Sequence, residues 1–157
     1  MRNRGMMLAA AAMLLAGCGE GEQKPAEPVV PVAFPAGSWE LDATVESVTS
    51  TDGSSPATDA KPGDRIARKA CIAKPEDLAG LFTAEGSDCT SLSDYARQGR
   101  INTAYKCAAR GGFISPMANG RYTANSFEVT LDTATMFSGS GDYQLRAKAT
   151  GRRLGDC

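Results

Sequence analysis

Residues 38–48 read SWELDATVESV, and this stretch alternates apolar and polar side chains with a period of two. Such a period with one polar face is typical of an antiparallel strand that buries its other face. The interval therefore predicts a half-buried strand. We expect the inward set to be Trp39, Leu41, Ala43 and Val45, and the outward set to be Glu40, Asp42, Thr44 and Glu46.

Further strand patterns surround this one. Residues 142–150 alternate as cleanly, with Tyr143, Leu145, Ala147 and Ala149 on the apolar side. Weaker patterns cover 65–72, 120–124 and 126–133, whereas 49–63 is rich in Ser, Thr, Asp, Gly and Pro and predicts a long exposed loop.

One short helix is predicted after the second strand. Pro75 suits a first helical position, and the acidic residues that follow it suit the positive helix N-terminus. The helix presents an apolar stripe and ends before Gly86; the stripe consists of Leu78, Leu81 and Phe82.

Residues 89–107 predict a hairpin. A three-residue loop, Arg97-Gln98-Gly99, would place Gly99 in the left-handed conformation. The expected facing pairs are Tyr95 with Ile101, Ser91 with Tyr105, and Cys89 with Cys107. Together these elements predict a mainly-β fold, an antiparallel meander of roughly seven strands that forms a curved sheet or small open barrel with one short helix.

The first 17 residues have the layout of a secretory signal, with Arg2 and Arg4 before an apolar run. Leu15-Ala16-Gly17-Cys18 resembles the bacterial lipobox, which implies cleavage before Cys18 and lipid on its thiol. The alternative is an ordinary secretory signal with a chance cysteine. The resemblance implies a membrane-anchored protein that faces the periplasm, and Gly19 favours the outer membrane over the inner. Residues 18–36 are Pro- and Glu-rich and predict a tether, and residues 37–157 predict one domain.

Four further cysteines, Cys71, Cys89, Cys107 and Cys157, predict two disulfides in an exported domain. Three pairings are open, and we prefer Cys71–Cys89 with Cys107–Cys157. The rival bond Cys89–Cys107 would join residues directly opposite on adjacent strands, where Cβ atoms are typically farther apart than a disulfide favours. Zinc is not expected because close C-x-x-C pairs are missing. We therefore expect no metal and no cofactor.

Charge is uneven along the chain. Residues 18–96 hold 6 basic and 14 acidic residues, whereas residues 97–157 hold 9 and 4. A basic face on the last strand would meet an anionic envelope component or a protein partner, and its candidates are Arg146, Lys148, Arg152 and Arg153. The alternative is that these residues pair with acidic residues on neighbouring strands. No nucleic-acid partner is expected.

No enzyme is predicted. The sequence contains no histidine, which excludes Ser-His-Asp and Cys-His catalysis, although a pair of carboxylates stays open. The aromatic residues on the predicted strands either line a pocket for an apolar ligand or fill the core.

Several motifs jointly resemble a known family. They are Gly37-Ser38-Trp39-Glu40, Cys71-Ile72 followed by Pro75-Glu76-Asp77, the cysteines 89 and 107 around Gly99, and the ending Thr150-Gly151-Arg152-Arg153-Leu154-Gly155-Asp156-Cys157. This pattern resembles the uncharacterised periplasmic family catalogued as domain of unknown function 3617. The resemblance implies an exported β-rich domain and implies no activity.

A second likeness concerns Tyr105-Lys106-Cys107, which resembles a tyrosine-x-cysteine piece of periplasmic lipoprotein inhibitors of lysozyme. The expected lipid anchor, the tether, the missing catalytic residues and the basic C-terminal half favour a non-enzymatic binding or envelope-support module. The alternatives are an inhibitor of a lytic enzyme such as lysozyme, or a carrier of a small apolar ligand.

Overall fold

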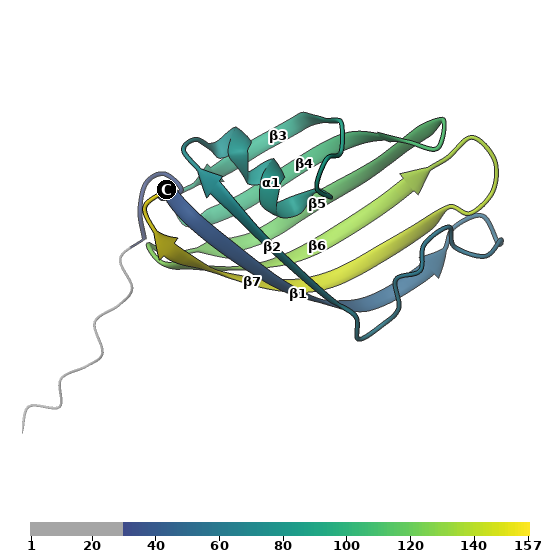
Figure 1. The fold of residues 1–157 in the computed structure, drawn as a ribbon, viewed down its shortest axis with the longest axis horizontal. Coiled ribbons are helices and arrows are strands. Elements are labelled where there is room, and N and C mark those ends of the chain that lie inside the picture. The colour runs from purple at the N-terminus through teal and green to yellow at the C-terminus, as the bar shows by residue number, and fades with distance from the viewer. Residues whose placement is uncertain (1–29) are drawn as a thin grey trace, which may run out of the picture.

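The computed structural model describes residues 30–157, which form seven strands and one short helical segment (Figure 1). The strands are β1 (Gly37–Ser50), β2 (Arg65–Ile72), β3 (Cys89–Arg97), β4 (Arg100–Ala109), β5 (Gly112–Tyr122), β6 (Ser126–Met136) and β7 (Tyr143–Gly155). A 3₁₀ turn, Pro75–Leu78, continues into α1 (Ala79–Phe82). No helix in this part of the chain is long and apolar enough to cross a membrane.

All seven strands belong to one antiparallel sheet in the order β2-β1-β7-β6-β5-β4-β3. The sheet curls into a half-barrel, and the helical segment lies between the two edge strands, β2 and β3 (Figure 1). The expected curved antiparallel meander with one short helix is thus confirmed. Strand β1 departs from simple neighbour order because it lies between β2 and β7.

Alternation along β1 and β7 decides which face is buried. The inward residues of β1 are almost completely buried, from Trp39 at 0% to Val45 at 2% exposed. On β7, Tyr143, Ala147 and Ala149 are buried as expected, while Leu145 is partly buried. The strand β2 and the helical segment also have the predicted residue ranges, whereas β5, β6 and β7 extend beyond theirs.

Phe34 packs into the aromatic end of the half-barrel. Its ring centroid lies 4.7 Å from that of Trp39 and 5.0 Å from that of Tyr122. The Trp39 indole N–H donates to the Pro35 carbonyl at 3.0 Å. The end of the expected tether, residues 31–36, therefore belongs to the folded domain, and the domain boundary expected at residue 37 was placed too late. The expected signal segment 1–17 and Cys18 lie outside the described residues.

The hairpin β3–β4 corrects the expected register near its turn. The outer pairs Cys89–Cys107 and Ser91–Tyr105 form as predicted, but an irregularity between Ser91 and Ser93 shifts the remaining pairs by one residue. The turn is therefore the two-residue Gln98-Gly99, with φ of 52° and 74°. Two positive φ values are typical of a type I′ turn, whose twist matches that of the flanking strands.

The disulfides are Cys71–Cys157 and Cys89–Cys107, so the preferred pairing was wrong. The Asp88 carbonyl accepts from the Ala108 N–H, which makes the neighbouring pair Cys89–Cys107 a non-hydrogen-bonded one. Strands approach most closely at such pairs, and the two Cα atoms are 3.9 Å apart.

The long bond has a separate cause. Ser38, near the start of β1, pairs with Cys71 on one side and with Gly155 on the other. The end of β7 therefore arrives next to the end of β2, and Cys157 reaches Cys71 with a Cα separation of 5.7 Å.

Candidate functional site

The basic residues expected to form a face on β7 are paired with acidic residues. Arg146 donates to Asp132 at 2.7 Å, and the ammonium of Lys148 lies 3.0 Å from Glu46. Hydrogen bonding to Asp132 raises the pKa of Arg146 above its usual value. The structure therefore shows the alternative, in which these basic residues pair with acidic residues on neighbouring strands.

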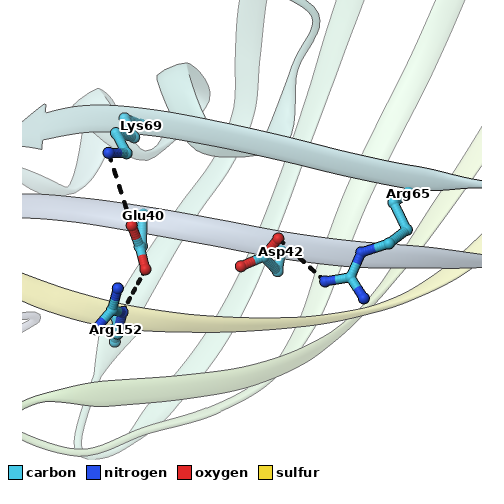
Figure 2. A network of polar contacts seen from close by, with 5 residues as sticks. All are labelled: Glu40, Asp42, Arg65, Lys69 and Arg152. Atoms are coloured by element: carbon cyan, nitrogen blue, oxygen red, sulfur yellow. Dashed lines mark hydrogen bonds and ion pairs between the residues drawn. The ribbon is translucent and has the colours of Figure 1, made fainter.

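Glu40 is the centre of the largest of these networks. Its carboxylate lies between Arg152 of β7 and Lys69 of β2, while the neighbouring Asp42 accepts from Arg65 at 3.3 Å (Figure 2). The Glu40 side chain is 17% exposed and forms ion pairs with both cations. These ion pairs join the three adjacent strands β2, β1 and β7 on the outer face of the sheet.

Arg153 does not share that face. It pairs with Trp39 in the β1–β7 register, donates from Nε to the Ala36 carbonyl at 2.8 Å, and contacts Asp156 at 2.7 Å. The four candidate residues therefore do not form one unpaired basic surface. They hold the sheet and its N-terminal segment together.

Three other arginines gather at the turn end of the β3–β4 hairpin. Arg97 pairs with Arg100 across β3 and β4, and Arg100 pairs with Arg121 across β4 and β5. All three are exposed, and none has a carboxylate within 4.0 Å among residues 30–157, although Glu128 is opposite Arg121 in register. Like charges directly opposite one another are destabilising, so this arginine triplet is not explained by stability.

The N-terminal segment reaches the same end of the molecule. Ala33 forms a β-bridge with Arg97, and the Gln98 N–H donates to the Val32 carbonyl at 2.9 Å. The arginine triplet therefore lies beside the point where the chain enters the folded domain. Sequence reasoning counted these arginines in the basic half but did not bring them together.

An open cleft of about 930 Å³ lies between β2 and the α1–β3 connection. Its walls are Arg65 to Lys69 on one side and Ala79, Gly80 and residues 83–87 with Cys89 on the other. Ile66, Ala79 and Ala84 give it apolar surface, and its charged residues are Arg65, Arg68, Lys69 and Glu85. A cleft of mixed polarity and this volume is within the range of small-ligand sites.

Arg68 occupies an inward position on β2. Its neighbours on that face are Ile66 and Ala70, which pack against the core, whereas Arg65 and Lys69 point outward to Asp42 and Glu40. Its Nη1 atom is buried and has no hydrogen-bond partner in the part of the chain that the structure describes. Burial lowers the pKa of the guanidinium, and Glu85 opposes that effect through its charge. The visible sequence signal is an arginine on the apolar side of the 65–72 alternation.

Two other buried polar atoms lack partners among the described residues, Thr103 Oγ1 and Tyr105 OH, both on inward positions of β4. Burial raises the pKa of Tyr105 to about 12, so its phenol is neutral over the whole physiological range. Arg68 is thus the one charged group with such an atom in residues 30–157.

Two acidic residues of the loops, Asp52 and Asp142, serve structural roles. Asp52 accepts from the hydroxyl and backbone N–H of Ser54 and from the backbone N–H of Gly141 and Asp142, at 2.7–3.1 Å. These hydrogen bonds hold its pKa well below the usual value. Asp142 accepts from Thr135 and from the Phe137 N–H. In residues 30–157 no three metal-ligating side chains come together.

Residues 30–157 thus form a disulfide-bonded half-barrel with an open cleft. The chain belongs to the family described as "Protein of unknown function (DUF3617)", whose model matches residues 31–157. The match begins at residue 31, three residues before the buried Phe34. Comparison with curated proteins and with solved structures finds no match.

Proposed function

We propose that this chain is a non-enzymatic module of the bacterial cell envelope, anchored through a lipid on Cys18 and facing the periplasm. The lipobox-like stretch that ends at Cys18 supports the anchor, and the docking of residues 31–34 onto the arginine-triplet end supports the orientation of the domain. Since the chain enters the domain there, this end of the half-barrel is the one nearest the anchor. The 13 residue-to-residue steps from Cys18 to Pro31 span at most roughly 45 Å when fully extended.

The arginine triplet fits that orientation. Arg97, Arg100 and Arg121 would face the anionic groups of the membrane or of an envelope component within reach of the tether. Cations near an anionic membrane surface contribute about 1 kcal/mol each, which orients a tethered domain without anchoring it alone. We therefore propose that the anionic partner contacts this triplet and not the basic residues of the last strand.

The non-enzymatic part of the proposal is supported by the carboxylates. Asp52 accepts several hydrogen bonds, and Asp142 accepts two, from Thr135 and Phe137, which fixes both carboxylates in place. A general acid or base needs a group that is available to a substrate proton.

No specific observation on the described residues favours either alternative, an inhibitor of a lytic enzyme or a carrier of a small apolar ligand. An apolar carrier would need room among the aromatic side chains, but Trp39 and Phe127 are almost completely buried with ring centroids 5.7 Å apart. In Tyr105-Lys106-Cys107, Tyr105 is 1% exposed and Cys107 is in a disulfide, which leaves Lys106 alone of the three to contact a lytic enzyme.

Metabolic labelling with an alkyne analogue of palmitate, followed by membrane fractionation, tests the anchor. The wild-type chain should carry the label and sediment with membranes, whereas Cys18→Ala should lose both properties. Met13→Ala, in the same segment, is the matched control and should change neither. A Cys18→Ala chain that still carries the label would refute the proposal.

A further inference from the structure

We propose that the cleft between β2 and the α1–β3 connection binds a small organic anion, with its carboxylate or phosphate on Arg68 and its apolar part against Ile66, Ala79 and Ala84. The inference deepens the proposed role as a binding module and rests on it. It names the ligand class and the residue that selects it.

Arg68 holds a cationic side chain on the inward face of β2. An unpaired charge inside a fold is costly unless a partner is present. The Arg68 side chain is partly buried, and its Nη1 atom is buried without a hydrogen-bond partner among residues 30–157, although β2 is an edge strand on which an outward arginine would be solvated at no such cost. An anion in the cleft would pair with the part of the Arg68 side chain that lines it. A guanidinium is well suited to hold carboxylate or phosphate through two parallel hydrogen bonds.

The charge balance of the cleft carries the second step. The lining residues include three cations and one carboxylate, Glu85. Arg65 and Lys69 are already paired with Asp42 and Glu40 on the outer face, so Arg68 is the cation left for a ligand. No ion pair within 4.0 Å joins Glu85 to a cation among residues 30–157. The negative charge of Glu85 acts on Arg68 and would repel an anion bound there.

The shape of the cleft carries the third step. Its volume of about 930 Å³ exceeds what an inorganic anion fills, and small side chains line the wall opposite Arg68. Gly80 lies so close to Ala70 that a Cβ on it would approach the Ala70 methyl at 3.1 Å. The helix therefore lies tightly against β2 beside the cleft.

A pair of fluorescent probes tests the assignment. The anionic 8-anilinonaphthalene-1-sulfonate and the neutral N-phenyl-1-naphthylamine share an aromatic skeleton and differ in charge. The full chain with both disulfides formed should bind the anionic probe, and Arg68→Gln should weaken that binding by at least about tenfold. Arg68→Lys should keep part of the affinity, and Glu85→Gln should raise it a fewfold. Arg146→Gln, with the same change in net charge, should leave it unchanged.

Three results would overturn the proposal. The first is equal binding of the anionic probe by Arg68→Gln and Arg146→Gln. The second is an equal loss of the neutral probe in Arg68→Gln, which would show a structural role only. The third is displacement of the probe by inorganic phosphate as readily as by decanoate, which would remove the apolar part of the ligand. Thermal unfolding of each variant verifies that it folds. Loss of palmitate labelling at Cys18 is a separate readout, so the anchor and the cleft can fail independently.

Discussion

Cys89 and Cys107 face each other across β3 and β4 with Cα atoms 3.9 Å apart, and the bond between them closes a hairpin with a sequence separation of 18. The second bond, Cys71–Cys157, has a sequence separation of 86. The loop-entropy relation gives about 3 kcal/mol for the short loop and about 4.6 kcal/mol for the long one. Cys71→Ser/Cys157→Ser should therefore lower the free energy of unfolding more than Cys89→Ser/Cys107→Ser.

Urea unfolding of the two double variants checks this order. A digest of the unreduced wild type, analysed by mass spectrometry, should contain both linked peptides. A peptide joining Cys71 to Cys89 would contradict the bonding described here.

Phe34→Ala should destabilise the domain by about 3 kcal/mol, because it empties a site among Trp39, Tyr122 and Phe127. Val32→Ala is the matched control, since Val32 is 79% exposed and should change stability little. Chemical unfolding followed by Trp39 fluorescence reports both, because the indole lies against the Phe34 ring. Equal stability of the two variants would mean that residues 31–36 are not part of the fold.

Neutralising the arginine triplet should reduce binding to anionic vesicles, whereas neutralising the paired residues of β7 should not. The two variants are Arg97→Gln/Arg100→Gln/Arg121→Gln and Arg146→Gln/Lys148→Gln/Arg152→Gln, each with a net change of three charges. Co-sedimentation with phosphatidylglycerol–phosphatidylcholine vesicles, using chains that also carry Cys18→Ala, measures the difference. We expect at least a fivefold loss for the first variant and less than a twofold loss for the second. The reverse order would restore β7 as the basic face.

Asp52 makes the contact between the loop after β1 and residues Gly141 and Asp142 sensitive to acid. Its hydrogen bonds, first to Ser54 and then to Asp142 and Gly141, depress its folded-state pKa below the usual 3.8. A depressed pKa stabilises the fold above the unfolded value, and this contribution is lost as the pH falls below about 4 towards the folded value. Asp52→Asn should therefore melt lower than wild type at pH 7, and its melting temperature should fall less steeply below pH 4.

Thermal scans from pH 7 to pH 2 measure that slope. Asp59→Asn, an exposed residue of the same loop, is the control and should follow the wild-type curve. Parallel curves for Asp52→Asn and wild type below pH 4 would exclude Asp52 as the acid-sensitive group.

The sequence predicts local features of this fold better than distant ones. The alternation from Trp39 to Val45 determines both the strand and its buried face, because period-two burial is a local property. The ends of the Cys89–Cys107 hairpin were also predictable. Its turn was not, because one bulge near Leu92 shifts the register and makes Gln98-Gly99 a two-residue turn.

Long-range relations needed the three-dimensional structure. The position of β1 between β2 and β7 brings Cys71 to Cys157, and no periodicity encodes that order. Strand neighbours likewise decide whether a cation is paired. Arg152 meets Glu40, whereas Arg97 meets Arg100. The inward arginine at position 68 was visible in the alternation of 65–72, but its significance depends on the cleft beside it.

The place of β1 between two covalently joined neighbours has a mechanical consequence. A pull on the N-terminal side first loads the Ala33–Arg97 bridge and the buried Phe34 ring. It then loads β1, which can slide only by shearing its ladders with β2 and β7 together. The Cys71–Cys157 bond prevents those two strands from spreading apart at the end where the load enters. A chain tethered at that end would therefore resist extraction by force more strongly than its modest length implies.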